Sequence, residues 1–87
     1  MKIAVFDTYI RRPDGRRMHF DILVDDAHKE LDTVLQHGKR YLSAKGLPEA
    51  ELTARECQFC HTEPGHPNME EEILQEGFAI IEMENCN

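Results

Sequence analysis

The chain has 87 residues, of which 40% are hydrophobic and 31% charged, and its 17 acidic and 10 basic residues give a net charge of −7. These proportions indicate one small globular domain over residues 1–87 rather than a disordered chain. The excess of acidic residues argues against a nucleic-acid partner, which needs a basic face. No apolar run approaches the roughly 18 residues that a membrane span requires, so no membrane partner is expected.

The first part of the chain predicts a β-hairpin. Residues 2–10 are rich in β-branched and aromatic side chains, and residues 17–24 alternate between apolar and polar. Between them, Pro13-Asp14-Gly15 predicts a three-residue turn that closes with a glycine in a positive-φ conformation. Strand residues whose numbers sum to 28 are then expected to pair, with Phe20 opposite Thr8 on the side that a helix covers.

The other side of the same hairpin predicts a small polar site of Asp7, Tyr9, His19 and Asp21. The register sets Asp7 opposite Asp21 and Tyr9 opposite His19. Two facing carboxylates repel, so we expect a charged histidine, an arginine, a bound cation or a shared proton to offset them. A solvent-screened pair is the alternative interpretation, and a register shifted by one residue would separate the two aspartates.

A long amphipathic helix is predicted over residues 26–45. Its apolar residues recur at helical spacing, and Asp25 or Asp26 is expected to cap its N-terminus. Gly38 lies on the apolar stripe and predicts a close approach to the sheet, and Gly46 is expected to end the helix.

The second half of the chain predicts two more strands and a short helix. We expect a strand over residues 53–61, a loop over 62–67, a helix over 69–76 capped by Asn68, and a strand over 78–83. The order β-β-α-β-α-β predicts an α+β fold with a single four-stranded sheet, covered on one face by the helix at residues 26–45. The shorter helix is expected at an end or edge of the sheet, and the direction of the third strand stays open.

The strongest candidate for a chemical role is the run Cys57-Gln58-Phe59-Cys60-His61, which holds two thiols and an imidazole. A Cys-x-x-Cys-His motif is compatible with covalent haem attachment, a thiol–disulfide redox pair or a zinc site. Haem is not favoured, because the N-terminus shows no export signal. The candidate zinc ligands are Cys57, Cys60, His66 and Cys86.

A structural interpretation of the same run competes with these chemical ones. In a strand, Cys57 and Phe59 share one face, and both are expected to point into the core beneath the helix at residues 26–45. Three cysteines, an odd number, together with the missing export signal predict free thiols and a cytoplasmic location.

The sequence resembles a small family of short bacterial proteins known only as a domain of unknown function. The resemblance lies in the opening Met-Lys-Ile-Ala-Val-Phe-Asp-Thr-Tyr, the run from Met18 to Val24, the run from Glu56 to His61 and the closing residues 80–84. It implies a compact soluble α+β domain of a family whose structures come from structural genomics. It implies no assigned catalytic residue and no haem.

Two functions follow from these observations. The first is a non-enzymatic binding module whose sheet face or rim binds another protein or a second copy of itself. The alternative is a metal site, with zinc as the candidate ion, or a thiol site built on the CQFCH motif. No cofactor other than zinc is suggested by the sequence.

Overall fold

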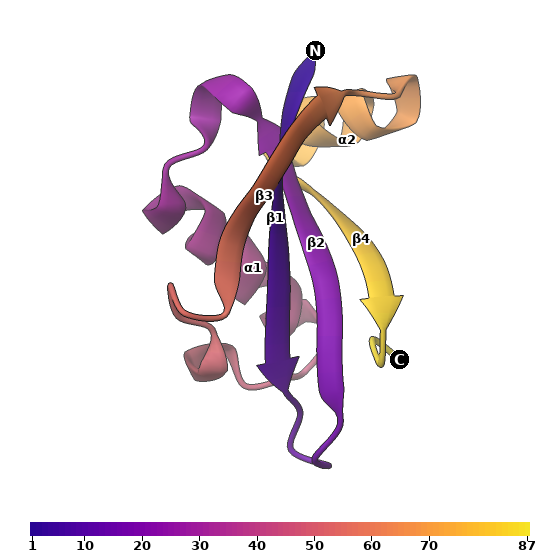
Figure 1. The fold of residues 1–87 in the computed structure, drawn as a ribbon. Helices are drawn as coiled ribbons and strands as arrows, with labels where there is room; N and C mark the ends of the chain where they lie inside the picture. The colour runs from indigo at the N-terminus through magenta and orange to yellow at the C-terminus, as the bar shows by residue number, and fades with distance from the viewer.

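The computed structural model describes all residues from Met1 to Asn87, and its centre is one four-stranded sheet (Figure 1). The strands lie in the order β3-β1-β2-β4, and every neighbouring pair is antiparallel, so β3 runs opposite to β1. The chain order β-β-α-β-α-β confirms the predicted α+β fold. The strands are β1 (Lys2–Arg11), β2 (Arg17–Asp25), β3 (Cys57–Pro64) and β4 (Ala79–Glu84).

The turn between β1 and β2 confirms the predicted hairpin register. Arg12 N–H donates to the Arg16 carbonyl at 2.8 Å, and Gly15 has a φ of +88°, a conformation that favours glycine. The Asp14 carboxylate accepts from Arg16 N–H at 3.0 Å and fastens the turn. The paired residues sum to 28 throughout, with Asp7 opposite Asp21 and Tyr9 opposite His19.

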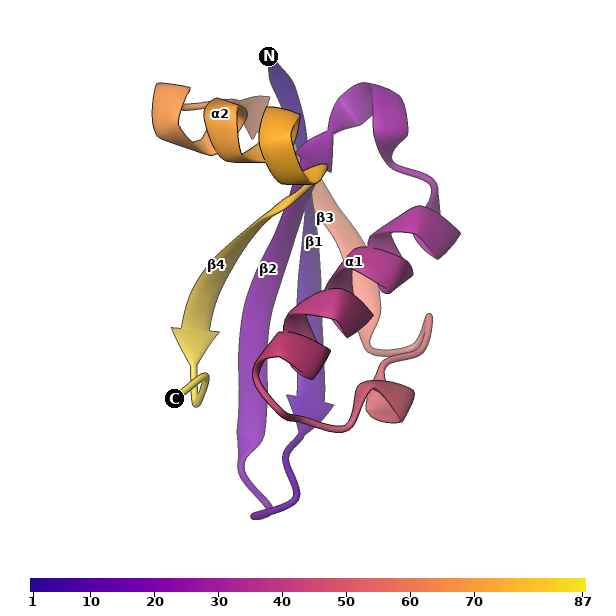
Figure 2. The same cartoon turned by 180° about the vertical axis from the view of Figure 1, so that it is seen from behind.

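Helix α1 (Leu31–Ala44) crosses one face of the sheet diagonally (Figure 2). Its Val34 and Leu42 pack on the even-numbered side chains of β1 and β2 to form the larger core. An added Cβ at Gly38 would stand 2.9 Å from Cδ1 of Ile22 and would also collide with Leu52, which confirms the close approach predicted at this glycine. Neither helix of the chain is long and apolar enough to cross a membrane.

The helix predicted over residues 26–45 is shorter than expected at its N-terminus. The Asp25 carboxylate accepts from Ala27 N–H at 3.0 Å and caps a single 3₁₀ turn, Asp26–His28. The chain then extends at Glu30, where ψ is 130°, before α1 begins at Leu31. The aspartate cap predicted at this point therefore serves the short turn and not the long helix.

Helix α2 (Pro67–Glu76) packs at the end of the sheet that holds the N-terminus (Figure 1). Its Ile73 packs with odd-numbered side chains of β1 and β2, whereas α1 packs on the even-numbered ones. Helix α2 therefore covers one end of the face opposite α1. The second core consists of Ile3, Val5, Leu23, Ile73 and Ala79, with Met69 against it. The predicted Asn68 cap is wrong: His66 is the N-cap residue and Pro67 occupies the first turn, a position that suits proline.

Strand β3 begins four residues later than predicted and extends through the first half of the predicted loop, residues 62–64. The Thr53 hydroxyl donates to the Glu56 carboxylate at 2.7 Å, and Arg55 N–H donates back to the Thr53 hydroxyl at 3.2 Å. These side-chain bonds hold a turn where a strand was expected. Pairing with β1 then runs from Cys57 to Pro64 at the edge of the sheet.

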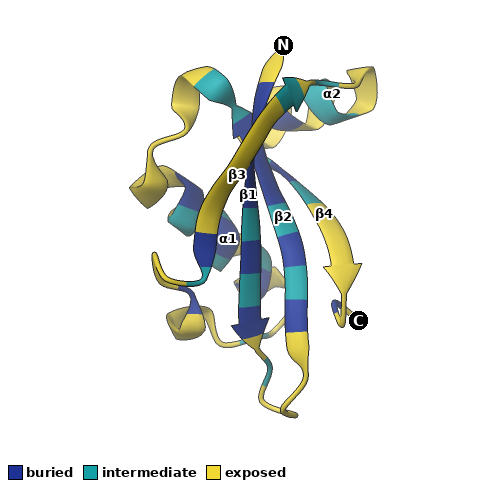
Figure 3. Ribbon diagram, in the orientation of Figure 1, coloured by how far each residue is buried: buried dark blue, intermediate teal, exposed yellow.

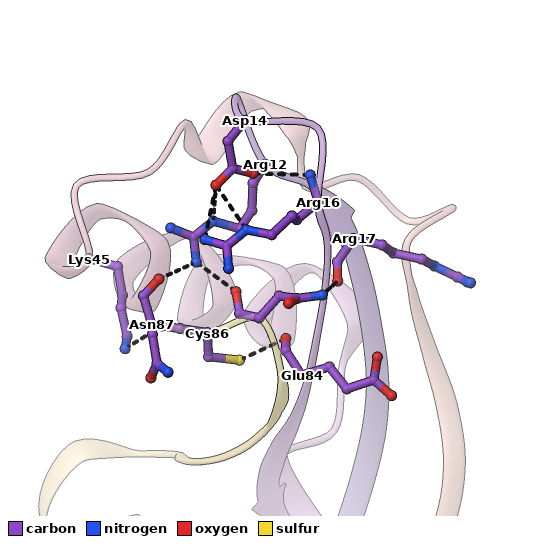
Figure 4. Close-up of polar contacts among 9 residues, drawn as sticks. Arg12, Asp14, Arg16, Arg17, Lys45, Glu84, Cys86 and Asn87 are labelled. Atoms are coloured by element: carbon purple, nitrogen blue, oxygen red, sulfur yellow. Dashed lines mark hydrogen bonds and ion pairs between the residues drawn. The ribbon is translucent and has the colours of Figure 1, made fainter.

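The C-terminal tail is tied back to the hairpin and to α1 (Figure 4). The Arg12 guanidinium donates to the carbonyls of Asn85 and Asn87, both at 2.6 Å. Lys45 Nζ donates to the Cys86 carbonyl at 2.8 Å. These contacts close the end of the larger core, where Cys86 is buried.

Phe59 is not in the core, contrary to the prediction. Cys57 is buried as expected, but 51% of Phe59 is exposed. Its ring still touches Phe6, with centroids 5.6 Å apart, so it lies on the expected face. Among the strands, α1 packs mainly on β2, and β3 at the edge of the sheet is mostly exposed beyond its first residue (Figure 3).

Alanine substitutions at two phenylalanines test this assignment of the core. Phe20 is fully buried, so Phe20→Ala should lower the free energy of unfolding by about 3–5 kcal/mol. Phe59→Ala should lower it by about 0.5–1.5 kcal/mol, the contribution typical of one aromatic edge contact. Urea unfolding followed by circular dichroism measures both, and equal losses would contradict the exposed position of Phe59.

Candidate functional site

The structure brings the four residues of the predicted polar site together on the face opposite α1. Helix α2 covers only one end of that face, and Asp7, Tyr9, His19 and Asp21 follow on β1 and β2 beyond it. They share a face because strand side chains alternate and these four are all odd-numbered.

His19 points its Nε2 atom between the two aspartates. Nε2 lies 3.7 Å from Asp7 Oδ1 and 3.5 Å from Asp21 Oδ1. One ligand atom from each of the three residues can be chosen so that all lie within 4.8 Å of one another. The side chains of His19 and Asp21 are only 15% and 16% exposed, whereas that of Asp7 is 39% exposed. The three residues therefore form a compact group of possible metal ligands, open to solvent on the Asp7 side.

Two atoms of this group lack hydrogen-bond partners. His19 Nε2 and Asp21 Oδ1 are both enclosed and have no hydrogen-bond partner, although they stand 3.5 Å apart and form an ion pair when His19 is protonated. A polar atom enclosed without a partner destabilises a fold by about 1–3 kcal/mol. The two unpartnered atoms face each other and Asp7, so a single bound group could satisfy both.

The paired carboxylates shift each other's pKa in opposite directions. The pKa of Asp21 is raised to about 6, first because the carboxyl is removed from water and then because protonated Asp21 donates a hydrogen bond to Asp7. The pKa of Asp7 is lowered, chiefly by that same hydrogen bond. The chain itself offers two of the expected ways of offsetting the pair: a proton shared between the carboxylates, and the His19 imidazole between them, which is charged when protonated.

Aromatic stacking fixes the imidazole. The rings of Tyr9 and His19 stack with centroids 4.1 Å apart and planes 15° apart. The guanidinium carbon of Arg17 stands 4.2 Å from the centroid of the Tyr9 ring. Tyr9 therefore serves as a support that holds His19 toward the aspartates.

Strand β3 has a β-bulge at Cys60, on the same face as the polar site. His61 pairs with Val5 and Phe59 pairs with Phe6, so Cys60 between them has no partner residue on β1. Cys60 and Asp7 line the same open hollow beside β3. Alternation along the strand already predicts that Cys60 lies on the face opposite Cys57 and Phe59, but it gave no signal of the bulge itself.

His61 and Glu63 extend the arrangement along β3. His61 Nδ1 lies 3.1 Å from the Cys60 sulfur, and His61 Nε2 lies 3.0 Å from the Glu63 carboxylate. In the neutral tautomer with the proton on Nε2, Nε2–H donates a hydrogen bond to the carboxylate and the Nδ1 lone pair faces the sulfur.

Neither cysteine of the motif is set up as a redox thiolate. Burial raises the pKa of Cys57, and partial desolvation together with neighbouring carboxylates raises the pKa of Cys60. Cys57 is buried in the core beneath α1, whereas Cys60 is exposed on the opposite face. The two thiols therefore cannot act as a pair.

The four candidate zinc ligands from the sequence do not gather at one point. Cys57 is buried in the larger core, Cys60 is exposed beside Asp7, His66 is the exposed N-cap residue of α2, and Cys86 lies in the tail with its sulfur 3.3 Å from the His19 carbonyl. The one cluster of three or more possible ligands is Asp7, His19 and Asp21.

Two hollows flank the edge strand β3. The larger, of about 880 Å³, is open and polar, and Asp7, Tyr9, Arg17 and Cys60 are among the residues that line it. The smaller, of about 450 Å³, lies on the α1 side and is mainly apolar. Phe6, Leu31, Cys57 and Phe59 line it, with Lys29 at its rim.

The fold and much of the sequence are shared with a solved structure. The NMR structure of protein NE1680 from Nitrosomonas europaea is 39% identical, with a TM-score of 0.86 and full coverage of both chains. No curated protein matches the chain. The resemblance noted in the sequence is confirmed, because the model of the family described as "Domain of unknown function (DUF2024)" matches residues 1–83. The chain belongs to this family of unknown function.

Proposed function

We propose that the chain binds a divalent transition-metal ion on its open sheet face, with Asp7, His19 and Asp21 as ligands. The observation that supports this most strongly is the pair of unpartnered, enclosed atoms, His19 Nε2 and Asp21 Oδ1, which face Asp7. An ion between the three side chains satisfies both atoms at once.

The spacing of the three ligands is close to that of a metal site. Zinc bonds to nitrogen and oxygen at about 2.0–2.2 Å, so two ligands in tetrahedral geometry stand roughly 3.3–3.6 Å apart. The distances from His19 Nε2 to the two carboxylates are 3.7 and 3.5 Å. All three ligand atoms lie within 4.8 Å of one another, so binding requires the carboxylates to close around the ion.

The charge of the site also favours a cation. A dication neutralises both carboxylates and removes the repulsion between Asp7 and Asp21 across the strand pair. An imidazole with two carboxylates suits zinc, iron and manganese better than calcium, which prefers six to eight oxygen ligands. We place this site at Asp7, His19 and Asp21 rather than at the four-residue set that the sequence suggested.

A second proposed function, self-association, is supported by the edge strand. β3 has a partner on one side only, and Phe59 and Leu31 beside it are 51% and 38% exposed. An unpaired edge with exposed apolar neighbours is a template for a further strand. We propose that the β3 strands of two copies pair antiparallel and bury both Phe59 rings.

Metal binding is tested with untagged protein that has been stripped with chelator. Calorimetric titration with Zn²⁺ or Mn²⁺ should give one site per chain, and an ion at 100 times its Kd should stabilise the fold by about 2.7 kcal/mol. Asp21→Asn and His19→Gln should each abolish binding. Asp32→Asn, at an exposed aspartate on α1, is the matched control and should bind normally.

The metal-free Asp21→Asn variant also separates a site from a structural pair. The substitution removes a carboxylate repulsion, so the variant should remain folded and should not be less stable at neutral pH. Normal binding by this variant, or no binding by the native chain, would refute the proposed site.

The raised pKa of Asp21 predicts a pH dependence of stability in the metal-free protein. The native state holds the Asp21 proton more tightly than the unfolded state, whose carboxyl has a pKa near 3.8. The contribution of this proton to the free energy of unfolding is therefore complete below pH 3.8 and is lost as the pH rises through about 6. Asp21→Asn should flatten the curve in this window, and carbon-13 NMR should show Asp21 titrating near pH 6. Titration of both aspartates near pH 3.8 would contradict the coupled pair.

Self-association is tested by light scattering across a range of concentrations. Phe59→Ser should shift the equilibrium toward the monomer, because the apolar contact at β3 is lost. Leu74→Ser is the matched control, since Leu74 is 75% exposed on α2, away from the edge strand. A native chain that stays monomeric at the highest concentration, or equal effects of both substitutions, would exclude this interface.

A further inference from the structure

The arginines of the chain fall into two groups, those with a carboxylate partner and those without. Arg12 and Arg16 form ion pairs with Asp14. Arg40 forms one with Glu76. The other guanidinium groups form neither an ion pair nor a hydrogen bond within the chain, and all of them line the larger hollow beside β3: Arg11, Arg17 and Arg55. The unpaired cationic groups are therefore gathered at one place on the surface.

Two of these arginines stand opposite each other on the central strands. Arg11 pairs with Arg17 in the same register that sets Asp7 opposite Asp21. All four are odd-numbered, so the open face carries a like-charged pair at two of its steps. Two like charges directly opposite each other destabilise a strand pair. As the carboxylate pair favours a cation, the guanidinium pair favours an anion.

The side chain of Arg17 connects this pair to the proposed metal site. Its guanidinium carbon stands 4.2 Å from the centroid of the Tyr9 ring, and the same ring stacks on His19. Figure 4 shows the Arg17 side chain pointing away from the ion pairs at Asp14. Its N–H groups have no acceptor in the chain, so they are free to donate to a ligand.

The net charge of the hollow depends on the metal ion. Besides the three guanidinium groups, the lining contains the carboxylates of Asp7, Glu51 and Glu56, so the charges balance in the empty hollow. Glu56 is already engaged, because its carboxylate accepts from the Thr53 hydroxyl at 2.7 Å. A divalent ion at Asp7 adds two positive charges, and an ion with three protein ligands keeps a coordination position open. The loaded hollow is therefore electropositive.

We propose that the metal-loaded hollow binds the phosphate group of a small phosphorylated molecule, with Arg11, Arg17 and Arg55 as its cationic partners. This inference rests on the metal site proposed above. Guanidinium groups donate in pairs to phosphate oxygens, and a phosphate monoester brings more negative charge than a carboxylate. A volume of about 880 Å³ is in the range of small-molecule sites. The net charge of −7 disfavours a nucleic acid as the source of the phosphate.

Phosphorus-31 NMR of methyl phosphate tests the proposal on protein loaded with Mn²⁺, with the protein in excess over the ion. The paramagnetic ion relaxes a nearby phosphorus nucleus, so the native protein should broaden the resonance. Arg11→Gln should weaken binding by at least about tenfold, because a charge-assisted hydrogen bond is lost. Arg40→Gln removes the same charge from α1 and is the matched control, which should bind normally. Acetate should bind more weakly than methyl phosphate, because it carries one charge.

Calorimetry with Mn²⁺ alone separates this inference from the proposed metal site. If Mn²⁺ binds but methyl phosphate does not, or if Arg11→Gln and Arg40→Gln bind methyl phosphate equally well, the hollow is not a phosphate site and the metal site stands. Equal affinity for acetate would overturn the preference for phosphate. Equal affinity of the metal-free protein for methyl phosphate would overturn the role of the ion. If no ion binds to the native chain, the metal site and this inference fail together.

Discussion

The antiparallel pairing of β1 and β2, in the register fixed by the turn at Pro13-Asp14-Gly15, determines the rest of the structure. Even-numbered residues of this hairpin form the core beneath α1, and odd-numbered residues form both the smaller core beneath α2 and the polar site. A strand side chain has only two faces available to it, so the core and the site are set by one choice of register.

The shared register has an energetic consequence for the site. Burial of Phe20, Ile22 and Val24 holds β2 firmly, and the same strand carries His19 and Asp21 on its other face. The chain cannot relieve the repulsion of Asp7 and Asp21 by sliding one strand, because a slip would expose the core. The apolar side of the hairpin therefore maintains the paired carboxylates on the other side, and the cation that we propose would meet ligands already in place.

The hairpin and its polar face could be predicted from the sequence because a local turn and strict alternation specify them. The start of β3 could not be predicted, because side-chain bonds of Thr53 override the strand preference of its neighbours. The bulge at Cys60 depends on pairing with the distant β1, and alternation within one segment carries no trace of it. The exposure of Phe59 depends on where α1 crosses the sheet, which the periodicity of α1 leaves undetermined.

The bulge at Cys60 also bears on how such a chain can change over evolutionary time. One residue inserted into β1 or β2 would exchange the inward and outward sets and destroy the core and the site together. An edge strand has one partner only, so β3 can absorb an extra residue locally, and Cys60 is such a residue. New side chains can thus reach the open face by insertion at the margin of the sheet, while the length of the central hairpin stays constrained.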